Sequence, residues 1–458
     1  MKTLCLINLG CPKNLVDGEV MLGRLAGAGF RPVADPAEAE VIVVNTCGFI
    51  EAAREEAVNV ILDAAAYKEK GACRLLVAAG CLVQDQRADL ADAIPELDAL
   101  VGLDEAHRIV ELCGGDPAAA SGVVRPGSGA PTRILGTPFH LAYLKIAEGC
   151  DNRCTFCTVP RIRGPLRSRP RETLLEEARV LVAGGVRELV LVAQDTTAYG
   201  HDAEGVDAGS APLAALLESL DTVPGLLRQR LMYAYPERLD DRLVQAVAGL
   251  PTVCPYVDIP LQHVSARILR RMGRGAGAPG GDAAAGAYQE LVDRLRAGIP
   301  GLAIRTSLIA GFPGETEAEF AELEDFLLRN RLEHVGVFAY SPEPGTPAAR
   351  LPGQLPQAEA EARRNHLMEV QQSISLELNR EIVGRTVPVL VDGVSRETDL
   401  LLEGRLCTQA WEVDGVVLIN DGECHAGELV QVEVTEAHPY DLVGRVVKRE
   451  GEGNGDGS

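Results

Sequence analysis

Three closely spaced cysteines are the residues whose types and spacing suggest chemistry most directly. Cys150, Cys154 and Cys157 lie in the segment EGCDNRCTFC and form a C-x3-C-x2-C pattern. Three thiolates at this spacing can bind three irons of one [4Fe–4S] cube and leave the fourth iron open to a substrate or cofactor. A zinc ion with a distant fourth ligand is the alternative for the same residues. The spacing and the aromatic residue Phe156 favour the iron–sulfur cluster.

A second set of three cysteines is spread over the N-terminal part of the chain. Cys11, Cys47 and Cys81 are separated by 36 and 34 residues, and each follows a short apolar segment that we interpret as a strand. Loops after successive parallel strands converge at one edge of a sheet, so these thiols are expected to meet there and to hold a second inorganic group. The alternative is three buried cysteines that act as small apolar side chains. The other six cysteines show no such pattern and are interpreted as structural.

The elements expected to position this second set form an α/β domain over residues 1–113. Apolar strand candidates alternate with amphipathic segments, which indicates a parallel sheet with helices on its faces. The strands are expected at 3–9, 40–46 and 74–80, and the helices at 13–28, 51–70 and 83–92. Residues 114–135 are expected to be a linker, because Gly, Pro, Ser and Ala dominate most of this stretch and resist packing.

The C-x3-C-x2-C motif is expected at the mouth of a larger α/β domain, residues 136–375. Six apolar segments with helical stretches between them predict an open, partial (β/α)6 barrel with right-handed crossovers. The strand candidates are 141–147, 188–194, 229–235, 256–262, 303–311 and 334–340. Because the motif follows the first strand, it lies at the carboxyl end of the barrel, where active sites form. The glycine-rich stretch 273–287 is interpreted as a loop and not as a phosphate site.

After a helical segment at 356–380 the pattern changes to short strands separated by turns. Five such segments predict a small all-β barrel of OB-like size over residues 376–447. They are TVPVLVDG, LLLEGRLC, GVVLIN, ELVQVEVTEA and DLVGRVV. The polar residues 448–458 are expected to be disordered. The predicted fold class is therefore α/β, with two α/β domains followed by one β-barrel.

Composition and charge restrict the partners and the compartment. Hydrophobic residues make up 46% and charged residues 24% of the 458 residues, which excludes a largely disordered chain. No apolar stretch is long enough for a membrane helix and the N-terminus lacks a signal-peptide pattern, so we expect a cytoplasmic protein without a membrane partner. In that compartment, twelve cysteines favour metal or redox chemistry. The net charge of −22 disfavours bare nucleic acid as a partner.

The cysteine motif together with six βα units resembles the radical S-adenosylmethionine enzymes. In that superfamily the open iron binds the amino and carboxylate groups of S-adenosylmethionine, and one electron from the cluster cleaves this cofactor to a 5′-deoxyadenosyl radical. The resemblance implies cofactor contacts from the backbone near one aromatic residue and from the ends of later strands. These candidates are Phe156, Gln194, Asp195, Gln262, Arg305, Gly311 and Gly314.

The whole chain is similar to a narrower family, the methylthiotransferases, in which three strand-end cysteines, a radical domain and a terminal TRAM barrel occur together. The segments LGCPKNLVDGE, NTCGFIEAAREE, KIAEGCDNRCTFC, VAQDTTAYG and SLIAGFPGET each resemble motifs of that family. CPKNLVD and QDTTAYG are similar to the branch that adds a methylthio group to the β-carbon of an aspartate in small-subunit ribosomal protein S-twelve. The branch that modifies an adenosine in transfer RNA is the alternative within the family.

The family resemblance implies two [4Fe–4S] clusters and two uses of S-adenosylmethionine. The cluster of the C-x3-C-x2-C motif would generate the radical that removes hydrogen from the aspartate. The cluster of the strand-end cysteines would hold an added sulfur, which a first S-adenosylmethionine methylates. All six cysteines would thus be catalytic through their clusters. A sulfur donor and a flavodoxin- or ferredoxin-type reductant are the implied partners.

The charge of the terminal barrel helps to decide between the two possible substrates, ribosomal protein S-twelve and transfer RNA. Residues 381–447 contain thirteen Asp and Glu against four Arg, a balance of −9. A barrel that binds nucleic acid needs the opposite sign, whereas a basic ribosomal protein would be attracted. The acids whose reversal is expected to weaken this attraction, if they face the partner, include Glu412, Asp414, Glu428 and Glu433.

Two further interpretations stay open at this point. The acidic face of the barrel could be solvated and have no partner. The chain could also be a non-enzymatic iron–sulfur or zinc protein that serves as a scaffold or electron carrier. Reductive cleavage of S-adenosylmethionine by the reconstituted protein would distinguish an enzyme from such a scaffold.

Overall fold

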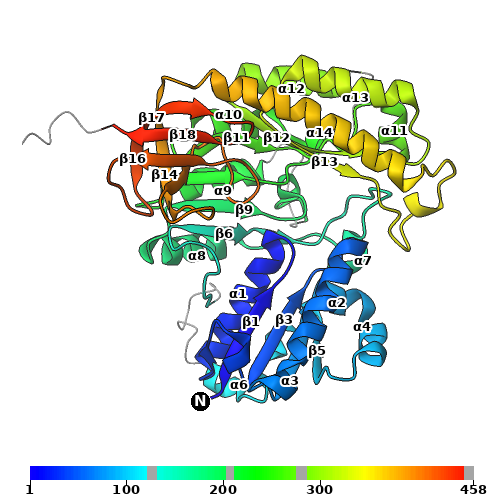
Figure 1. The fold of residues 1–458 in the computed structure, drawn as a ribbon, viewed down its shortest axis with the longest axis vertical. Coiled ribbons are helices and arrows are strands. Elements are labelled where there is room, and N and C mark those ends of the chain that lie inside the picture. The colour runs from blue at the N-terminus through cyan, green and yellow to red at the C-terminus, as the bar shows by residue number, and fades with distance from the viewer. Residues whose placement is uncertain (121–131, 203–210, 275–285, 448–458) are drawn as a thin grey trace, which may run out of the picture.

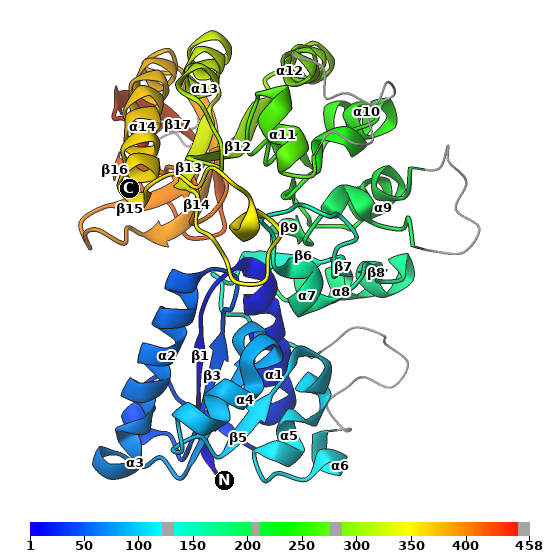
Figure 2. The same cartoon turned by 90° about the vertical axis from the view of Figure 1, so that its right-hand side faces the viewer.

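Three blocks of structure make up the computed structural model of the chain (Figure 1). The described residues are 1–120, 132–202, 211–274 and 286–447, and none of the helices in these ranges is long and apolar enough to cross a membrane. Figure 2 shows the N-terminal block below the central block, with the C-terminal barrel beside the latter. The expected tail at 448–458, half of the expected linker at 114–135 and most of the glycine-rich stretch at 273–287 lie outside the described residues.

The N-terminal domain is a parallel sheet of five strands in the order β2-β1-β3-β4-β5. The strands are β1 (Thr3–Asn8), β2 (Arg31–Pro32), β3 (Val41–Thr46), β4 (Leu75–Gly80) and β5 (Ala99–Val101). The helices are α1 (Pro12–Gly27), α2 (Glu51–Ala65), α3 (Tyr67–Lys70), α4 (Cys81–Ala93), α5 (Ile109–Leu112) and α6 (Pro117–Ala120). The three expected strands are present, because their continuous apolar runs are covered on both faces.

A few elements differ from the sequence prediction. The sequence did not predict β2 and β5, because strands of two and three residues are too short to show a pattern. α4 begins at Cys81 and not at residue 83, so the third strand-end cysteine is the first residue of the helix. The helix expected at 51–70 is divided into α2 and α3. The helix α6 lies inside the expected linker, whose limits stay a prediction.

The central domain contains six parallel strands in the order β13-β12-β11-β10-β9-β6, an open partial barrel as expected. Its strands are β6 (Leu141–Lys145), β9 (Glu188–Val192), β10 (Arg228–Leu231), β11 (Val253–Asp258), β12 (Ala303–Ala310) and β13 (His334–Ala339). The helices are α7 (Val159–Arg163), α8 (Arg171–Ala183), α9 (Pro212–Asp221), α10 (Asp241–Gly249), α11 (Ala266–Arg271), α12 (Ala287–Gly298) and α13 (Glu317–Asn330). β7 (Ala147–Glu148) and β8 (Arg167–Ser168) form a short antiparallel pair beside the first strand.

The C-terminal barrel follows a long helix, α14 (Gln357–Arg380), which lies along β13. The barrel is closed in the order β14-β15-β16-β18-β17, and this confirms the expected small all-β domain. Its strands are β14 (Thr386–Val394), β15 (Leu402–Arg405), β16 (Val417–Asp421), β17 (Leu429–Ala437) and β18 (Leu442–Val446). Short apolar segments separated by turns are the pattern that identified these strands.

The interior of the partial barrel is filled by residues of the C-terminal barrel. Trp411 lies against Tyr143 of β6 with ring centroids 6.3 Å apart, in a core that also contains Tyr256 of β11. Buried charges cross the same boundary, because Glu188 of β9 pairs with Arg405 of β15 at 2.9 Å. The C-terminal barrel is therefore part of the central domain's core.

The end of the linker region ties the N-terminal and central domains together. Arg133 forms ion pairs with Glu19 of α1 and with Glu177 of α8, and its side chain is only 2% exposed. Removing one partner of a buried ion pair strongly destabilises the fold, since the remaining charge is then both unpaired and shielded from water. This pairing fixes α1, which carries Cys11 at its N-terminus, against the central domain.

Candidate functional site

The three strand-end cysteines lie at the carboxyl edge of the N-terminal sheet. Cys11 is the residue before α1, and Cys47 and Cys81 directly follow β3 and β4. In a sheet of order 2-1-3-4-5 the chain changes direction between β1 and β3, and the loops that leave these strands form the crevice in which ligands bind. The fold thus brings the three cysteines to one edge, as expected from their spacing.

Small residues allow these cysteines to approach one another. Gly10 has a φ of +85°, and a Cβ at this position would lie 2.6 Å from the Cβ and 2.9 Å from the Sγ of Cys47. A Cβ on Gly48 would lie 3.1 Å from the carbonyl carbon of Cys81. A larger residue at either position would push the three loops apart.

The three thiols differ in their electrostatic environment. Burial raises the pKa of Cys81 to about 12 and also raises the pKa of Cys47. Burial acts in the same direction on Cys11, but Lys13, Arg163 and the amides at the start of α1 outweigh it and hold the pKa of Cys11 below its ordinary value. Thiols beside cations and a helix N-terminus are suited to bind iron as thiolates.

The C-x3-C-x2-C cysteines lie in the loop between β7 and α7, at the carboxyl end of the first barrel strand. The N–H of Cys150 donates to the carbonyl of Gly164 at 3.0 Å, and the N–H of Cys157 donates to the carbonyl of Cys154 at 3.1 Å. Burial raises the pKa of Cys150 to about 11 and that of Cys157 to about 12. The loop is short and internally bonded, so its cysteines form a compact set.

The donor set fits an iron–sulfur cube better than a single ion. Each set offers three thiols, from Cys150, Cys154 and Cys157 and from Cys11, Cys47 and Cys81. A tetrahedral zinc site needs four ligands around one centre. A cube instead binds each thiolate through a different iron, so its ligands lie further apart. Each set of three cysteines therefore suits a cluster with one open iron.

Asp195, one of the expected cofactor residues, is bonded to the C-x3-C-x2-C loop. Its carboxylate accepts a hydrogen bond from Asn152 at 2.7 Å and pairs with Arg238, which also donates to the Oδ1 of Asn152 at 3.0 Å. The same carboxylate caps the turn after β9 through the N–H of Ala198. Its charge adds to burial in raising the pKa of Cys150. The end of β9 thus holds the cysteine loop in place.

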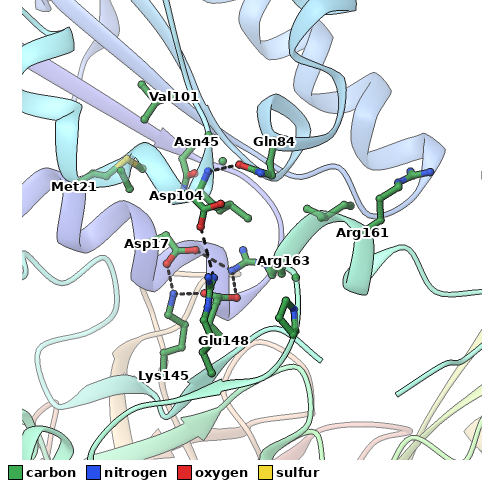
Figure 3. Close-up of a pocket in the computed structure, with 18 residues that line it drawn as sticks. Asp17, Met21, Asn45, Gln84, Val101, Asp104, Lys145, Glu148, Arg161 and Arg163 are labelled. Atoms are coloured by element: carbon green, nitrogen blue, oxygen red, sulfur yellow. Dashed lines mark hydrogen bonds and ion pairs between the residues drawn. The ribbon is translucent and has the colours of Figure 1, made fainter. Parts of the chain in front are cut away.

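A buried cluster of charged side chains lies where the N-terminal and central domains meet (Figure 3). Arg163 of α7 donates to the Sγ of Cys81 at 3.1 Å, and its other nitrogen donates to Asp17 at 3.1 Å and to Glu148 at 2.9 Å. Lys145 pairs with both carboxylates. Burial acts to raise the pKa of Glu148, but Lys145 and Arg163 outweigh it and hold this pKa at about 2. Side chains of both domains therefore meet beside the cysteines.

A cavity of about 270 Å³ opens beside this charged cluster. Asn45 and Gly80, from the ends of β3 and β4, line it on one side, and Glu148 and Arg163 line it on the other. Figure 3 shows Asn45 above the charged cluster and Arg161, two residues before Arg163 in α7, to the right of it. The boundary between the domains therefore has room for a small group next to the strand-end cysteines.

Two other expected cofactor residues, Gln194 and Gln262, follow barrel strands, and Phe156 lies in the cysteine loop. Gln194, after β9, donates to Glu148 at 3.0 Å. Gln262, after β11, has a φ of +70° and bridges to Leu308 of β12. The ring of Phe156 meets the ring of Phe312 edge-on, with centroids 6.5 Å apart. These residues surround the mouth of the partial barrel.

The two expected glycines have close neighbours of their own. Gly311 and Gly314 adopt φ values of +76° and +79°. A Cβ on Gly311 would overlap Ala360 of α14, and a Cβ on Gly314 would lie 3.1 Å from Arg271 of α11. Packing of the turn after β12 against these helices therefore accounts for both glycines, and their contact with a cofactor stays a prediction.

Arg305 of β12 is bonded to carboxylates from two domains. Its guanidinium is 3.2 Å from Asp258 and 3.3 Å from Asp414, which belongs to the C-terminal barrel. Asp414 also accepts a hydrogen bond from Tyr256 at 2.8 Å, and its side chain is 1% exposed. Asp414 is thus buried between domains and cannot belong to a surface that attracts a basic partner. Among the acids expected there, Glu412 and Glu428 are exposed.

The sequence analysis missed several residues of this region. Lys13 lies over the ring of Tyr233 at 3.3 Å from its centroid, directly after Cys11 and its neighbouring proline. Glu148 lies inside the quoted motif, but nothing local marks a buried carboxylate. Arg163 is one of several arginines in the run VPRIRGPLRSRPRE, so only the fold distinguishes it.

A second buried ion pair closes the N-terminal domain onto the last barrel strand. Glu343, in the loop after β13, accepts hydrogen bonds from Arg54 at 2.7 Å and from the N–H of Glu51 at 3.1 Å, both in α2. The side chains of Arg54 and Glu343 are 7% and 3% exposed. α2 follows the loop of Cys47, so this contact holds that loop near the mouth of the barrel.

Comparison with known proteins assigns each domain to a family. Residues 3–102 match the uncharacterized protein family UPF0004, residues 144–327 match the radical SAM superfamily and residues 383–447 match the TRAM domain. Among solved structures, the radical S-adenosylmethionine methyltransferase TsrM from Kitasatospora setae, with cobalamin and a [4Fe-4S] cluster bound, is similar at a TM-score of 0.53. It is 15% identical over 84% of this chain and 79% of its own, so this likeness concerns the fold alone.

Three whole-chain relatives illustrate the similarity of the complete chain. The ribosomal protein uS12 methylthiotransferase RimO of Anaeromyxobacter sp. (strain K) is 50% identical over 96% of this chain and 92% of its own length. The RimO proteins of Syntrophotalea carbinolica and Geobacter sulfurreducens are each 44% identical, over 97% and 96% of this chain and 97% and 98% of their own. On this similarity, which runs through all three domains, the chain belongs to the RimO family of ribosomal protein uS12 methylthiotransferases.

Proposed function

We propose that this protein transfers a methylthio group to the β-carbon of an aspartate in ribosomal protein uS12. The observation that carries the proposal is the position of Arg163, which is six residues after Cys157 and bonds to the Sγ of Cys81 and to Glu148, two residues before Cys150. Membership of the RimO family supports uS12 as the substrate, and it does not favour the transfer-RNA alternative.

The proposal assigns one [4Fe–4S] cluster to each set of cysteines and S-adenosylmethionine to the mouth of the partial barrel. The cysteines are Cys150, Cys154 and Cys157 for the first cluster and Cys11, Cys47 and Cys81 for the second. When bound, these groups supply a 5′-deoxyadenosyl radical at the first site and a place for an added sulfur at the second. A flavodoxin- or ferredoxin-type protein is the proposed electron donor, with a separate sulfur donor.

The chain's own part in this proposal is to position the two sites. Asn152, Asp195 and Arg238 fix the first cysteine loop. Arg163 and Glu148 are bonded to one another and line the cavity at the boundary between the domains.

The C-terminal barrel is the proposed surface for the basic substrate protein. Its balance of −9 would accelerate the encounter with uS12, mainly through the association rate, and salt would screen this effect beyond about 8 Å. Reversal of the exposed Glu412 and Glu428 to Lys is the appropriate test of this surface. Asp414 is excluded from such a variant, because its change would break a buried ion pair.

The decisive experiment is turnover on the protein substrate. Anaerobically reconstituted protein is incubated with uS12, S-adenosylmethionine, a reductant and sulfide, and the uS12 peptides are read by mass spectrometry. We expect the aspartate peptide to gain one methylthio group in place of a hydrogen. The matched control is uS12 with the target aspartate changed to asparagine. An unmodified aspartate peptide, from protein that still cleaves S-adenosylmethionine, would refute the proposal.

A parallel incubation with transfer RNA tests the alternative. Bulk transfer RNA replaces uS12 under the same conditions, and nucleosides are analysed after digestion. We expect no methylthioadenosine above the level of a control without enzyme. Its formation at a rate equal to or above that on uS12 would move the assignment to the nucleic-acid branch of the family.

A further inference from the structure

Arg163 reaches from the central domain to a sulfur atom of the N-terminal domain. It is the last residue of α7, six residues after Cys157, and it is 5% exposed. Its Nη2 lies 3.1 Å from the Sγ of Cys81, the cysteine at the end of β4. A residue beside one cysteine set therefore donates a hydrogen bond to a member of the other.

The direction of this hydrogen bond is fixed by carboxylates on the opposite side of the guanidinium. The Nη1 of Arg163 donates to Asp17 at 3.1 Å and to Glu148 at 2.9 Å. Glu148 is itself held by Lys145 at 2.7 Å and by Gln194 at 3.0 Å. With Nη1 occupied in this way, Nη2 is left to point at the sulfur.

A cation at this distance has a defined effect on a metal-bound thiolate. Hydrogen bonds to the cysteine sulfurs and nearby charge are the means by which a protein sets the reduction potential of an iron–sulfur cluster. Reduction adds one negative charge to the cluster, so a positive donor favours the reduced form. Arginine stays charged at any accessible pH, so the effect is permanent.

The first cysteine loop has charges of both signs beside it. Burial and Asp195 act together to raise the pKa of Cys150, whereas Arg238 acts to lower it, and at Cys157 burial raises the pKa while Arg274 acts to lower it. Among the described residues, no side chain donates a hydrogen bond to the sulfur of Cys150, Cys154 or Cys157, whereas Arg163 donates to the sulfur of Cys81. The second site therefore differs by a direct hydrogen bond from a cation to a cysteine sulfur.

We propose that Arg163 is a positioning residue for the second cluster, and that its guanidinium stabilises the Cys81 ligand and raises the reduction potential of that cluster relative to a site without this cation. The inference rests on the proposed function, which assigns a cluster to Cys11, Cys47 and Cys81. It adds a role for a residue that is neither an iron ligand nor part of the cysteine motif.

The test isolates the second cluster before Arg163 is changed. The full chain with Cys150, Cys154 and Cys157 all changed to Ala serves as the parent, since its remaining iron belongs to the second site. Arg163→Gln removes the charge, Arg163→Lys keeps it, and Arg161→Gln is the matched control. Arg161 lies on the same helix but pairs with Asp85 at 2.8 Å, away from the sulfur. Each protein is reconstituted anaerobically and followed by iron analysis and by redox titration with electron paramagnetic resonance.

We expect the variants to differ in the reduction potential of the second cluster. At one fixed potential, Arg163→Gln should have a reduced-to-oxidised ratio about tenfold below the parent, which corresponds to about 59 mV for one electron. Arg163→Lys should stay closer to the parent, and Arg161→Gln should match it. If Arg163→Gln instead loses iron, Arg163→Lys should retain more of it. Equal values for the Gln and Lys variants, in both iron content and potential, would overturn the proposal, as would a Gln variant that equals the parent.

The parent protein separates this inference from the function on which it rests. If the parent retains about half of the wild-type iron, the second cluster is present and the comparison of Arg163 variants decides the inference. If the parent holds no iron, the assignment of two clusters fails, and with it the inference about Arg163.

Discussion

The two cysteine sets differ in how the chain brings them together. One set occupies a single loop between Cys150 and Cys157, and the other is collected from three loops between Cys11 and Cys81. The geometry of the first set depends on the loop's own hydrogen bonds and on its bonds to the end of β9. The geometry of the second depends on the spacing of three strands, on two glycine contacts and on contacts with another domain. Distant substitutions should therefore disturb the second set more than the first.

The largest effects are expected from the cysteines themselves. Cys47→Ala should abolish methylthio transfer to uS12 and leave reductive cleavage of S-adenosylmethionine measurable, because the radical site is complete without it. Cys154→Ala should abolish both reactions. The measurement is the amount of 5′-deoxyadenosine and of modified uS12 from each reconstituted protein. Loss of cleavage in Cys47→Ala, with the first cluster intact by spectroscopy, would contradict the separation of roles.

The iron content of each protein tests the number of clusters. The triple variant with Cys150, Cys154 and Cys157 changed to Ala should hold about half of the iron of the wild type, which should contain about eight irons per chain for two [4Fe–4S] clusters. A triple variant with all of the iron, or with none, would show that the cysteines do not form two independent sites.

The next largest effect is expected at Gly10. In Gly10→Ala the new methyl group would lie 2.6 Å from the Cβ of Cys47, so the second site should lose most of its iron while the first site keeps its own. Gly29→Ala is the matched control, since Gly29 has a similar φ of +90° with no atom within 4 Å of its Cβ position. In both variants an alanine must adopt a positive φ, which costs about 1–2 kcal/mol. Equal iron loss in the two variants would show that backbone strain, not contact with Cys47, is responsible.

A smaller, partial effect is expected from the contact between domains. Glu343→Gln should weaken the pair with Arg54 and lower the free energy of unfolding by about 2 kcal/mol, less than for a fully isolated charge because Glu51 still pairs with Arg54 at 2.5 Å. Iron at the second site should fall, and iron at the first should not. Urea unfolding and iron analysis provide the measurements. Glu55→Gln, an exposed change on the same helix, should alter neither.

The smallest effect on either cysteine set is expected at Asp392 of the C-terminal barrel. Burial acts to raise the pKa of Asp392, but His140 and Arg405 outweigh it and hold this pKa below its ordinary value. The carboxylate thus stabilises the fold above a pH of about 4, and this contribution is lost as the pH falls through the lowered pKa. Asp392→Asn should lower stability by about 1–3 kcal/mol near neutral pH, with unchanged iron. Thermal unfolding from pH 7 to pH 3 should show the difference from the wild type shrinking in acid, and a constant difference would exclude this cause.

The two sets also show what a sequence reveals and what it conceals. The loop set was visible as a local spacing. The strand-end set could be predicted because each cysteine follows an apolar run, and the parallel order of β1, β3 and β4 then brings them to one edge. The three-domain fold was confirmed for the same reason, since buried strands and the alternating strands of a small barrel leave distinct patterns.

Contacts between domains could not be predicted in this way. Arg163 and Glu343 have partners more than eighty residues away along the chain, and no periodic pattern encodes such pairs. Arg305 is a further case. Its place on a barrel strand predicts a cofactor contact, which stays a prediction, and its ion pair with Asp414 of the C-terminal barrel has no signal in the sequence.

The filled interior of the partial barrel limits how relatives of this protein can be recombined. A chimera that exchanges the C-terminal barrel at residue 380 would remove Arg405 and leave Glu188 of β9 with Arg230 in a vacated core. It would also remove Trp411 from the ring of Tyr143. Functional chimeras should therefore exchange the inward-facing residues of β6, β9 and β10 together with the barrel. The segment that must be exchanged as one unit thus includes residues of both the central domain and the C-terminal barrel.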